Sequence, residues 1–223
     1  MASSLPSLAR VASIAATAAF AGVLAGVGPV APMQQSGPAS KAADSLIPKV
    51  KPATPNDLDF RPGALRLVTD SETGSRFWVF TYVIANKTGK SQRFSPRFEL
   101  LMGDGTVLEA GRDVPVDAAR RMQSAAAGPR ALDQFQVMGE IPDGESNARE
   151  GFVVWPAKGD AKEMTLFVAG TSAAFDRRTD PATGKEGLIR RTWSRRYSVS
   201  GSTDPRSSAE ASFDPIGDAW IMR

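Results

Sequence analysis

The chain has 223 residues, a length typical of one domain with additional segments, and its hydrophobic fraction of 42% is sufficient for a buried core. It contains no cysteine and no histidine, which excludes disulfide frameworks, Ser-His-Asp triads and ordinary zinc sites, so we expect no metal or other cofactor. The net charge is +3, from 27 basic and 24 acidic side chains, and this small excess predicts no nucleic-acid partner.

The N-terminal segment has the composition of a secretory signal. Arg10 precedes an uncharged apolar run from Val11 to Val30, and Val23-Leu24-Ala25 places small residues where cleavage before Gly26 requires them. We therefore predict a signal peptide over residues 1–25 and an exported protein that is periplasmic, secreted or associated with the cell envelope. Two alternatives stay open. The run is long enough for an uncleaved membrane anchor, which would be the expected membrane contact, or it forms a buried core helix.

Residues 26–57 are predicted to form a linker rich in proline, alanine and serine. Six prolines lie between Pro29 and Pro55, and the segment shows neither the period of a strand nor that of a helix. The folded domain is therefore expected over residues 58–223.

Strand-length apolar runs begin after Leu58. The first is Ala64–Val68, and the strongest is Arg76–Ala85, in which almost every residue is aromatic or β-branched. Because both faces of the second run are apolar, it is expected to be a central strand buried on two sides. Residues 86–89 read Asn-Lys-Thr-Gly, which predicts a turn after it.

A hairpin and several further strands are expected downstream. Phe94–Met102 and Thr106–Glu109 flank Gly103-Asp104-Gly105, a sequence typical of a tight reversal. The remaining apolar runs are expected strands: Gln134–Met138, Gly151–Trp155, Met164–Ala169 and Leu188–Val199. Short strands separated by turn sequences indicate a sandwich or a barrel.

One helix interrupts this pattern. Asp113 and Pro115 are typical of a helix start, and Gly128 followed by proline marks its end. The residues expected on its apolar face are Val116, Ala119, Met122 and Ala126.

Four sequence motifs together resemble a known family. In order they are Asn-x-Thr-Gly at 86–89, Phe-x-Leu-x-x-Gly-Asp-Gly at 98–105, Gly-x-Ile-Pro-x-Gly-Glu-Ser at 139–146 and Gly-Phe-Val-Val-Trp at 151–155. The segment Arg76–Gly170 resembles the small immunoglobulin-like domains of bacterial envelope proteins. The resemblance implies an all-β, Ig-like antiparallel β-sandwich of about seven or eight strands with one short inserted helix. Its motifs are turns and core strands, so they specify a fold and not an activity.

Acidic and aromatic residues offer few sites for chemistry. Asp104, and Asp143 with Glu145, could supply oxygens to Ca²⁺, but they lie in sequences that tight turns require in any case. A catalytic carboxylate pair would have to come from Glu109, Asp113 and Asp117, or from Asp133 and Glu140. The aromatic residues expected in the core are Trp78, Tyr82 and Trp155, whereas Trp193 is equally consistent with the core and the surface.

The most unusual segment is Arg190–Tyr197. In an extended conformation Arg191, Trp193, Arg195 and Tyr197 share one face, and this solvent-exposed strip would suit an anionic polymer or a phosphate. The candidate anion-binding residues are Arg190, Arg191, Trp193, Arg195, Arg196 and Tyr197. The competing interpretation is an edge strand whose arginines prevent aggregation.

These observations predict a non-catalytic, exported interaction or scaffold module of the cell envelope, with an envelope protein as partner. The alternative is a ligand-binding or inhibitory module that captures an anionic polymer through Arg190–Tyr197. An enzyme restricted to carboxylate chemistry is the third candidate.

Overall fold

The computed structural model of the protein describes residues 56–204 and 211–223. Within these ranges the chain forms eleven β-strands and one α-helix, so the expected all-β class is confirmed. The predicted signal peptide over 1–25 lies outside the described residues, and so does the predicted linker over 26–57 apart from Asn56 and Asp57.

The first sheet has three antiparallel strands in the order β1-β2-β7. They are β1 Asp59–Thr69, β2 Arg76–Asn86 and β7 Gly144–Pro156. Strand β2 lies in the middle and is buried along almost its whole length, which confirms the expected central strand. Gly151 of β7 faces Tyr82 of β2, and a β-carbon at Gly151 would lie 2.3 Å from the Tyr82 ring. The glycine therefore makes room for the tyrosine.

The second sheet has the order β11-β10-β8-β4-β5, and β9 pairs with the first part of β10. All its pairings are antiparallel. Its strands are β4 Arg97–Met102, β5 Val107–Glu109, β8 Glu163–Ala169, β9 Phe175–Thr179, β10 Glu186–Gly201 and β11 Ala211–Met222. A separate pair consists of β3 Gln92–Phe94 and β6 Gly139–Ile141.

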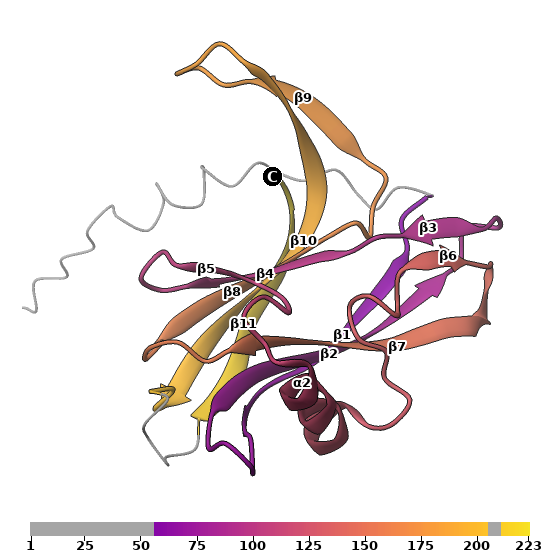
Figure 1. Cartoon of the computed structure of the whole chain (residues 1–223). Coiled ribbons are helices and arrows are strands. Elements are labelled where there is room, and N and C mark those ends of the chain that lie inside the picture. Colours follow the sequence, from indigo (N-terminus) through magenta and orange to yellow (C-terminus); the bar gives the residue numbers. More distant parts are fainter. Residues whose placement is uncertain (1–55, 205–210) are drawn as a thin grey trace, which may run out of the picture. The chain divides into compact units, whose positions relative to one another are not determined.

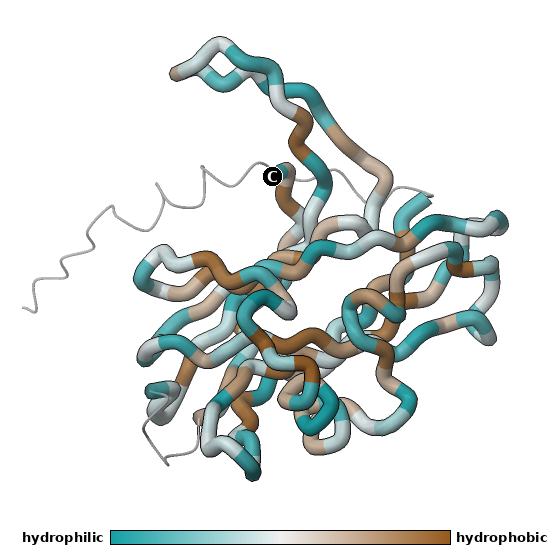
Figure 2. Tube along the Cα trace, in the orientation of Figure 1, coloured by the Kyte–Doolittle hydropathy of each residue, from teal (hydrophilic) through white to brown (hydrophobic). Residues whose placement is uncertain are grey.

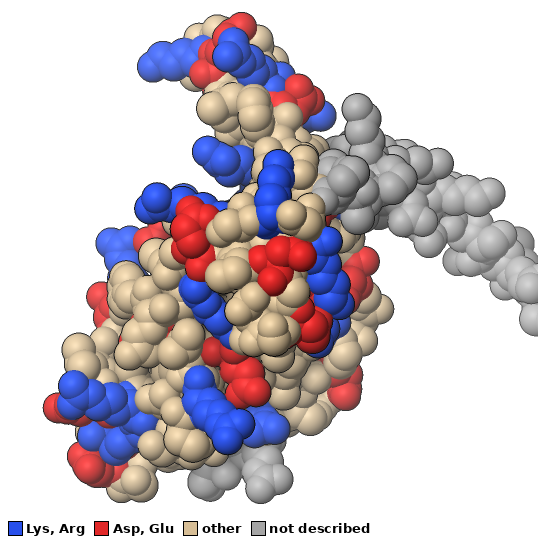
Figure 3. Space-filling model, turned by 90° about the vertical axis from the view of Figure 1, so that its right-hand side faces the viewer, with Lys and Arg blue, Asp and Glu red and all other residues tan. Residues whose placement is uncertain are grey.

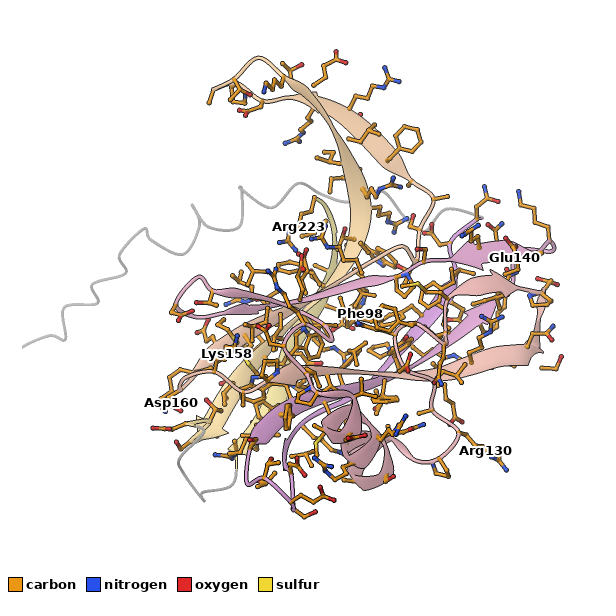
Figure 4. All side chains as sticks on the ribbon, in the orientation of Figure 1. Phe98, Arg130, Glu140, Lys158, Asp160 and Arg223 are labelled. Carbon is orange, nitrogen blue, oxygen red and sulfur yellow. The ribbon has the colours of Figure 1, made fainter. Side chains whose placement is uncertain are left out.

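The two larger sheets contribute to a single hydrophobic core (Figure 1). Rings from opposite sheets meet there: the centroids of Tyr82 and Phe98 are 4.9 Å apart, and those of Phe60 and Trp193 are 5.0 Å apart. Figure 4 shows Phe98 in this interior. The arrangement is compatible with a β-sandwich. The expected core positions of Trp78, Tyr82 and Trp155 are confirmed, and Trp193 is also buried.

A helix covers the outer face of the first sheet. It comprises α2 Val116–Met122 and a turn of π-helix, η1 Gln123–Ala127, and ends at Gly128, whose φ of 88° suits glycine. Ala118 and Met122 pack against Phe77, Val79, Phe152 and Val154. The predicted burial of Met122 on the apolar face is confirmed. That of Val116 is wrong, because Val116 is 67% exposed. Val114, four residues before Ala118, packs on the sheet instead.

The expected strand Gln134–Met138 is wrong. Residues 134–137 form a turn, because the Asp133 carboxylate accepts hydrogen bonds from the backbone N–H groups of Phe135 (2.8 Å) and Gln136 (2.9 Å). A short acidic side chain that binds its own backbone in this way competes with strand pairing.

The eleven strands exceed the seven or eight that were expected, because β3, β6, β9 and β11 were not foreseen. Strand β11 follows the last strand that the sequence predicts, Leu188–Val199, in a segment for which no strand is expected. Its sequence contains Pro215 and Gly217, which lie at a register shift opposite Arg196 and Tyr197. Proline and glycine are tolerated there because β11 is at the end of the sheet order and the shift is a bulge.

Candidate functional site

Strand β10 carries the predicted arginine strip, but it is not an edge strand. Residues Trp193–Ser198 pair with β8 on one side, and Arg191–Gly201 pair with β11 on the other. The interpretation of the strip as an edge guard is therefore wrong, because both edges of the strand are hydrogen-bonded to neighbours.

The face that combines arginine and aromatic residues points inward rather than to solvent. Arg191, Trp193 and Tyr197 are buried, with exposed fractions of 3%, 5% and 2%. Arg191 forms an ion pair with Asp57 at 2.8 Å, and its guanidinium lies 4.4 Å from the centroid of Trp220. Burial raises the pKa of Tyr197 to about 12. The expected solvent exposure of this face is wrong, because its aromatic residues belong to the core.

Arg195 and Arg196 are engaged with carboxylates. Arg195 donates two hydrogen bonds to Asp218, at 2.6 and 2.7 Å, and this interaction is the main reason that its pKa is raised. The exposed Arg196 forms a longer ion pair with Glu163 at 3.4 Å. Arg190 differs from both, because it is exposed and makes no ion pair with any residue that the structure describes.

Arg190 lines a groove on the outer face of the second sheet, with a volume of about 570 Å³. The uncharged lining includes Phe167 and Ala169 of β8 and Thr192 of β10, which we call the floor, together with Leu188 and Gly170. The charged residues in its lining are Arg97, Arg190, Arg223 and Glu99. The groove is thus partly apolar at its base and basic in its lining.

The charges around the groove are partly compensated. Glu99 forms ion pairs with Arg97, at 2.9 Å, and with Arg223. Arg97 also contacts Glu109 at 2.5 Å, and this hydrogen bond raises the pKa of Arg97. The guanidinium of Arg223 lies 4.2 Å from the centroid of Phe167. Figure 4 shows Arg223 where β10 leaves the sheet.

Beyond the groove, β9 and the first part of β10 project from the sheet as a two-stranded arm (Figure 1). All five residues of β9 are exposed. Phe175 and Leu188 are 60% and 58% exposed, although they are apolar. Figure 2 shows that the tip of the arm is mostly hydrophilic, and Figure 3 shows both basic and acidic side chains on it.

A second hollow lies on the opposite side of the core, between α2 and the turn at 134–137. It has a volume of about 410 Å³ and is lined by Val116, Ala119, Gln123 and Phe152 among others. Phe135 also lines this hollow and is 70% exposed.

The carboxylates considered for catalysis or metal binding are distributed over separate surface contacts. Glu109 pairs with Arg97 and Arg112, Asp113 with Lys158, and Asp117 with Arg120. Glu140 accepts a hydrogen bond from Ser91, while Glu145 pairs with Arg61 and Lys87. Asp104 accepts a hydrogen bond from the N–H of Thr106 within the expected turn. Within the described ranges, no group of three or more acidic residues could hold a metal ion.

The six predicted residues therefore do not form one site, and the groove includes residues that were not predicted from the sequence. Of the six predicted residues, Arg190 reaches the groove, where it joins Arg97, Glu99, Phe167 and Arg223. The alternation of Arg97 and Glu99 with apolar neighbours could have placed both on an outer face. No comparable signal marks Arg223, because its position depends on the pairing of β11.

Comparisons of the chain with protein families, with curated proteins and with solved structures found no match. Among the described residues, no helix has both the length and the apolar character needed to cross a membrane.

Proposed function

We propose that this protein is a non-catalytic, exported interaction or scaffold module of the cell envelope, and that its projecting arm contacts the partner. The observation that carries the proposal is the exposure of Phe175 and Leu188 on strands that leave the sheet. An isolated two-stranded hairpin is marginally stable in water, and clustered exposed apolar side chains mark interaction surfaces. A partner that covers the arm would stabilise it.

The order of the strands supports an Ig-like sandwich. In immunoglobulin domains, strands A, B and E are neighbours in one sheet, and G, F, C and C′ are neighbours in the other. The orders β1-β2-β7 and β10-β8-β4-β5 correspond to these two series when the strands are taken along the chain. Strand D has no counterpart in the first sheet: the interval between β5 and β7 contains α2, η1 and β6, and β6 pairs with β3 instead of β7. Export is supported by the composition of residues 1–25.

Affinity isolation from an envelope extract tests this proposal. The wild-type domain is compared with a Phe175→Ser, Leu188→Ser double variant and with the control Val107→Ser, whose site is 45% exposed on another strand. We expect one defined partner to be retained by the wild type and the control and lost with the double variant. Retention by all three proteins would contradict the assignment of the contact to the arm.

A second candidate function is the capture of an anionic polymer, which is supported by Arg97, Arg190 and Arg223 around one groove. Binding through several arginines should release counterions and weaken steeply with salt. Retention on a polyanion column at two salt concentrations tests this candidate. An Arg190→Ser variant should elute earlier than the wild type, and an unchanged elution position would count against the groove.

A further inference from the structure

The register of β10 and β11 places two arginines directly opposite each other. The N–H of Arg190 donates to the carbonyl of Arg223 at 2.6 Å, and the N–H of Arg223 donates to the carbonyl of Arg190 at 3.0 Å. In an antiparallel pair of this kind the two side chains emerge on the same face, about 5 Å apart at their β-carbons. Like charges in this arrangement are destabilising unless an anion lies near them.

A carboxylate of the protein neutralises the charge of Arg223 but not that of Arg190. Glu99, whose side chain is 13% exposed, binds both Arg97 and Arg223. Arg190 has no such partner among the described residues, although it lines the same groove. The groove lining therefore contains three guanidinium groups and one carboxylate, and the uncompensated charge lies at the Arg190 end.

The rest of the groove suits an apolar body rather than a bare ion. Phe167 and Ala169 belong to the floor, and Leu188 of the arm also lines the groove. The volume of about 570 Å³ is within the range of small-molecule sites, roughly 300–1,000 Å³. Guanidinium groups bind carboxylates and phosphates through paired hydrogen bonds. An amphipathic anion would therefore satisfy both parts of the groove.

We propose that this groove binds a small ligand whose oxyanion group, a carboxylate or a phosphate, lies between Arg190 and Arg223 while its ring or hydrocarbon body packs beside Phe167, whose ring Arg223 already contacts. The proposal goes beyond both candidate functions above: it uses the arginines of the groove but replaces the polymer with a small ligand. Glu99 is the internal competitor for the ligand, because it already occupies Arg97 and Arg223.

Titration of the domain with phenyl phosphate, phenylacetate, inorganic phosphate and polyphosphate tests the proposal. Phenyl phosphate or phenylacetate should bind at least about tenfold more tightly than inorganic phosphate, because the ring removes additional apolar surface from water. Whichever of the two probes binds more tightly identifies the oxyanion. Equal affinity for phenyl phosphate and inorganic phosphate would overturn the proposed role of the apolar floor. Tighter binding of polyphosphate, with a steep salt dependence, would support the polymer candidate and overturn the small-ligand proposal.

Three variants locate the binding site. Arg190→Gln should weaken binding of the preferred aromatic probe about tenfold or more, because it removes a charge-assisted hydrogen bond. Arg196→Gln is the matched control on the same strand, since Arg196 is exposed but does not line the groove, and its affinity should not change. Glu99→Gln should tighten binding severalfold by releasing Arg97 and Arg223. Equal losses for Arg190→Gln and Arg196→Gln, or weaker binding by Glu99→Gln, would overturn the site.

The ligand titrations and the partner-isolation experiment can fail separately, although Leu188 belongs to both the arm and the groove lining. If the aromatic anions fail to bind while the arm variant still loses its partner, the ligand inference fails and the proposed interaction function stands.

Discussion

The arginines of β10 show how burial changes the role of one residue type. Arg191 is 3% exposed, lies against Trp220 and pairs with Asp57, whose side chain is 7% exposed. Arg196, five positions further along the strand, is 61% exposed and its partner Glu163 is equally accessible. Removing one member of a buried ion pair leaves the other charge without compensation, whereas water readily replaces an exposed partner.

This contrast gives a first prediction. Arg191→Ser should lower the free energy of unfolding by about 3–5 kcal/mol, because it breaks a buried pair. Arg196→Ser should lower it by less than about 1 kcal/mol, because an exposed pair contributes little. Urea denaturation of the two variants measures both values. Similar losses in the two proteins would show that Arg191 is not buried as described.

Asp70 connects the turn after β1 to the helix. Its carboxylate accepts two hydrogen bonds from Arg121 of α2, both at 2.7 Å, and one from the Thr73 hydroxyl at 2.8 Å. The hydrogen bonds from Arg121 are the main reason that the pKa of Asp70 lies far below its usual value of 3.8. The carboxylate is therefore stabilised in its charged form in the folded state.

The second prediction follows from this depressed pKa. The contribution of Asp70 to stability should be complete above the pKa in the unfolded chain, about 3.9, and should be lost as the pH falls from there toward the folded-state value. Unfolding free energies measured between pH 5 and pH 2.5 should therefore fall less steeply for Asp70→Asn than for the wild type. Parallel profiles for the two proteins would contradict the role of Asp70.

At the scale of elements, β2 contributes to two hydrophobic clusters, one on each of its faces. One face, with Phe80, belongs to the core between the sheets, and the other, with Val79, packs beneath α2. This explains why the run from Arg76 to Ala85 is apolar on both faces.

The third prediction concerns this strand. Phe80→Ala should cost about 3–5 kcal/mol, as expected for a core aromatic residue, because Phe80 is completely buried. Phe135→Ala is a suitable control, since Phe135 is 70% exposed, and its effect should stay within about 0.5 kcal/mol. Thermal or urea denaturation distinguishes these outcomes. A near-neutral Phe80→Ala would mean that β2 is not central.

The sequence allowed prediction of elements whose local pattern and tertiary environment agree. The apolar strand β2, the hairpin around Asp104 and the helix ending at Gly128 all carry such patterns. Strand β9 is fully exposed and polar apart from Phe175, and β11 contains Pro215, so neither has a strand-like sequence. Their conformations depend on pairing with β10.

The candidate site was predictable to a smaller extent. The sequence drew attention to the arginines of β10, but alternation alone cannot say which face of a strand is buried. The structure buries the face of Arg191 and Trp193 and leaves Arg190 on the other. The groove also requires Arg97 and Arg223. These two residues and Arg190 are far apart in the sequence, and they meet only because of the order of the strands in the sheet.

At the scale of the whole molecule, export is the broadest expectation. Cleavage after Ala25 should produce a mature chain that begins at Gly26. N-terminal sequencing of protein isolated from the producing cells measures this directly, together with fractionation of the envelope. An intact Met1 terminus on a cytoplasmic protein would contradict the prediction.

The central claim is that the projecting arm of β9 and β10 is the contact surface of an interaction module. The most direct test places a photoreactive amino acid at Leu188 of the arm and, separately, at Ile216 of β11, which is similarly exposed at 56%. After irradiation of intact cells, we expect a discrete crosslinked species from position 188 and none from position 216. No crosslink at 188, or the same crosslinked species from both positions, would contradict it.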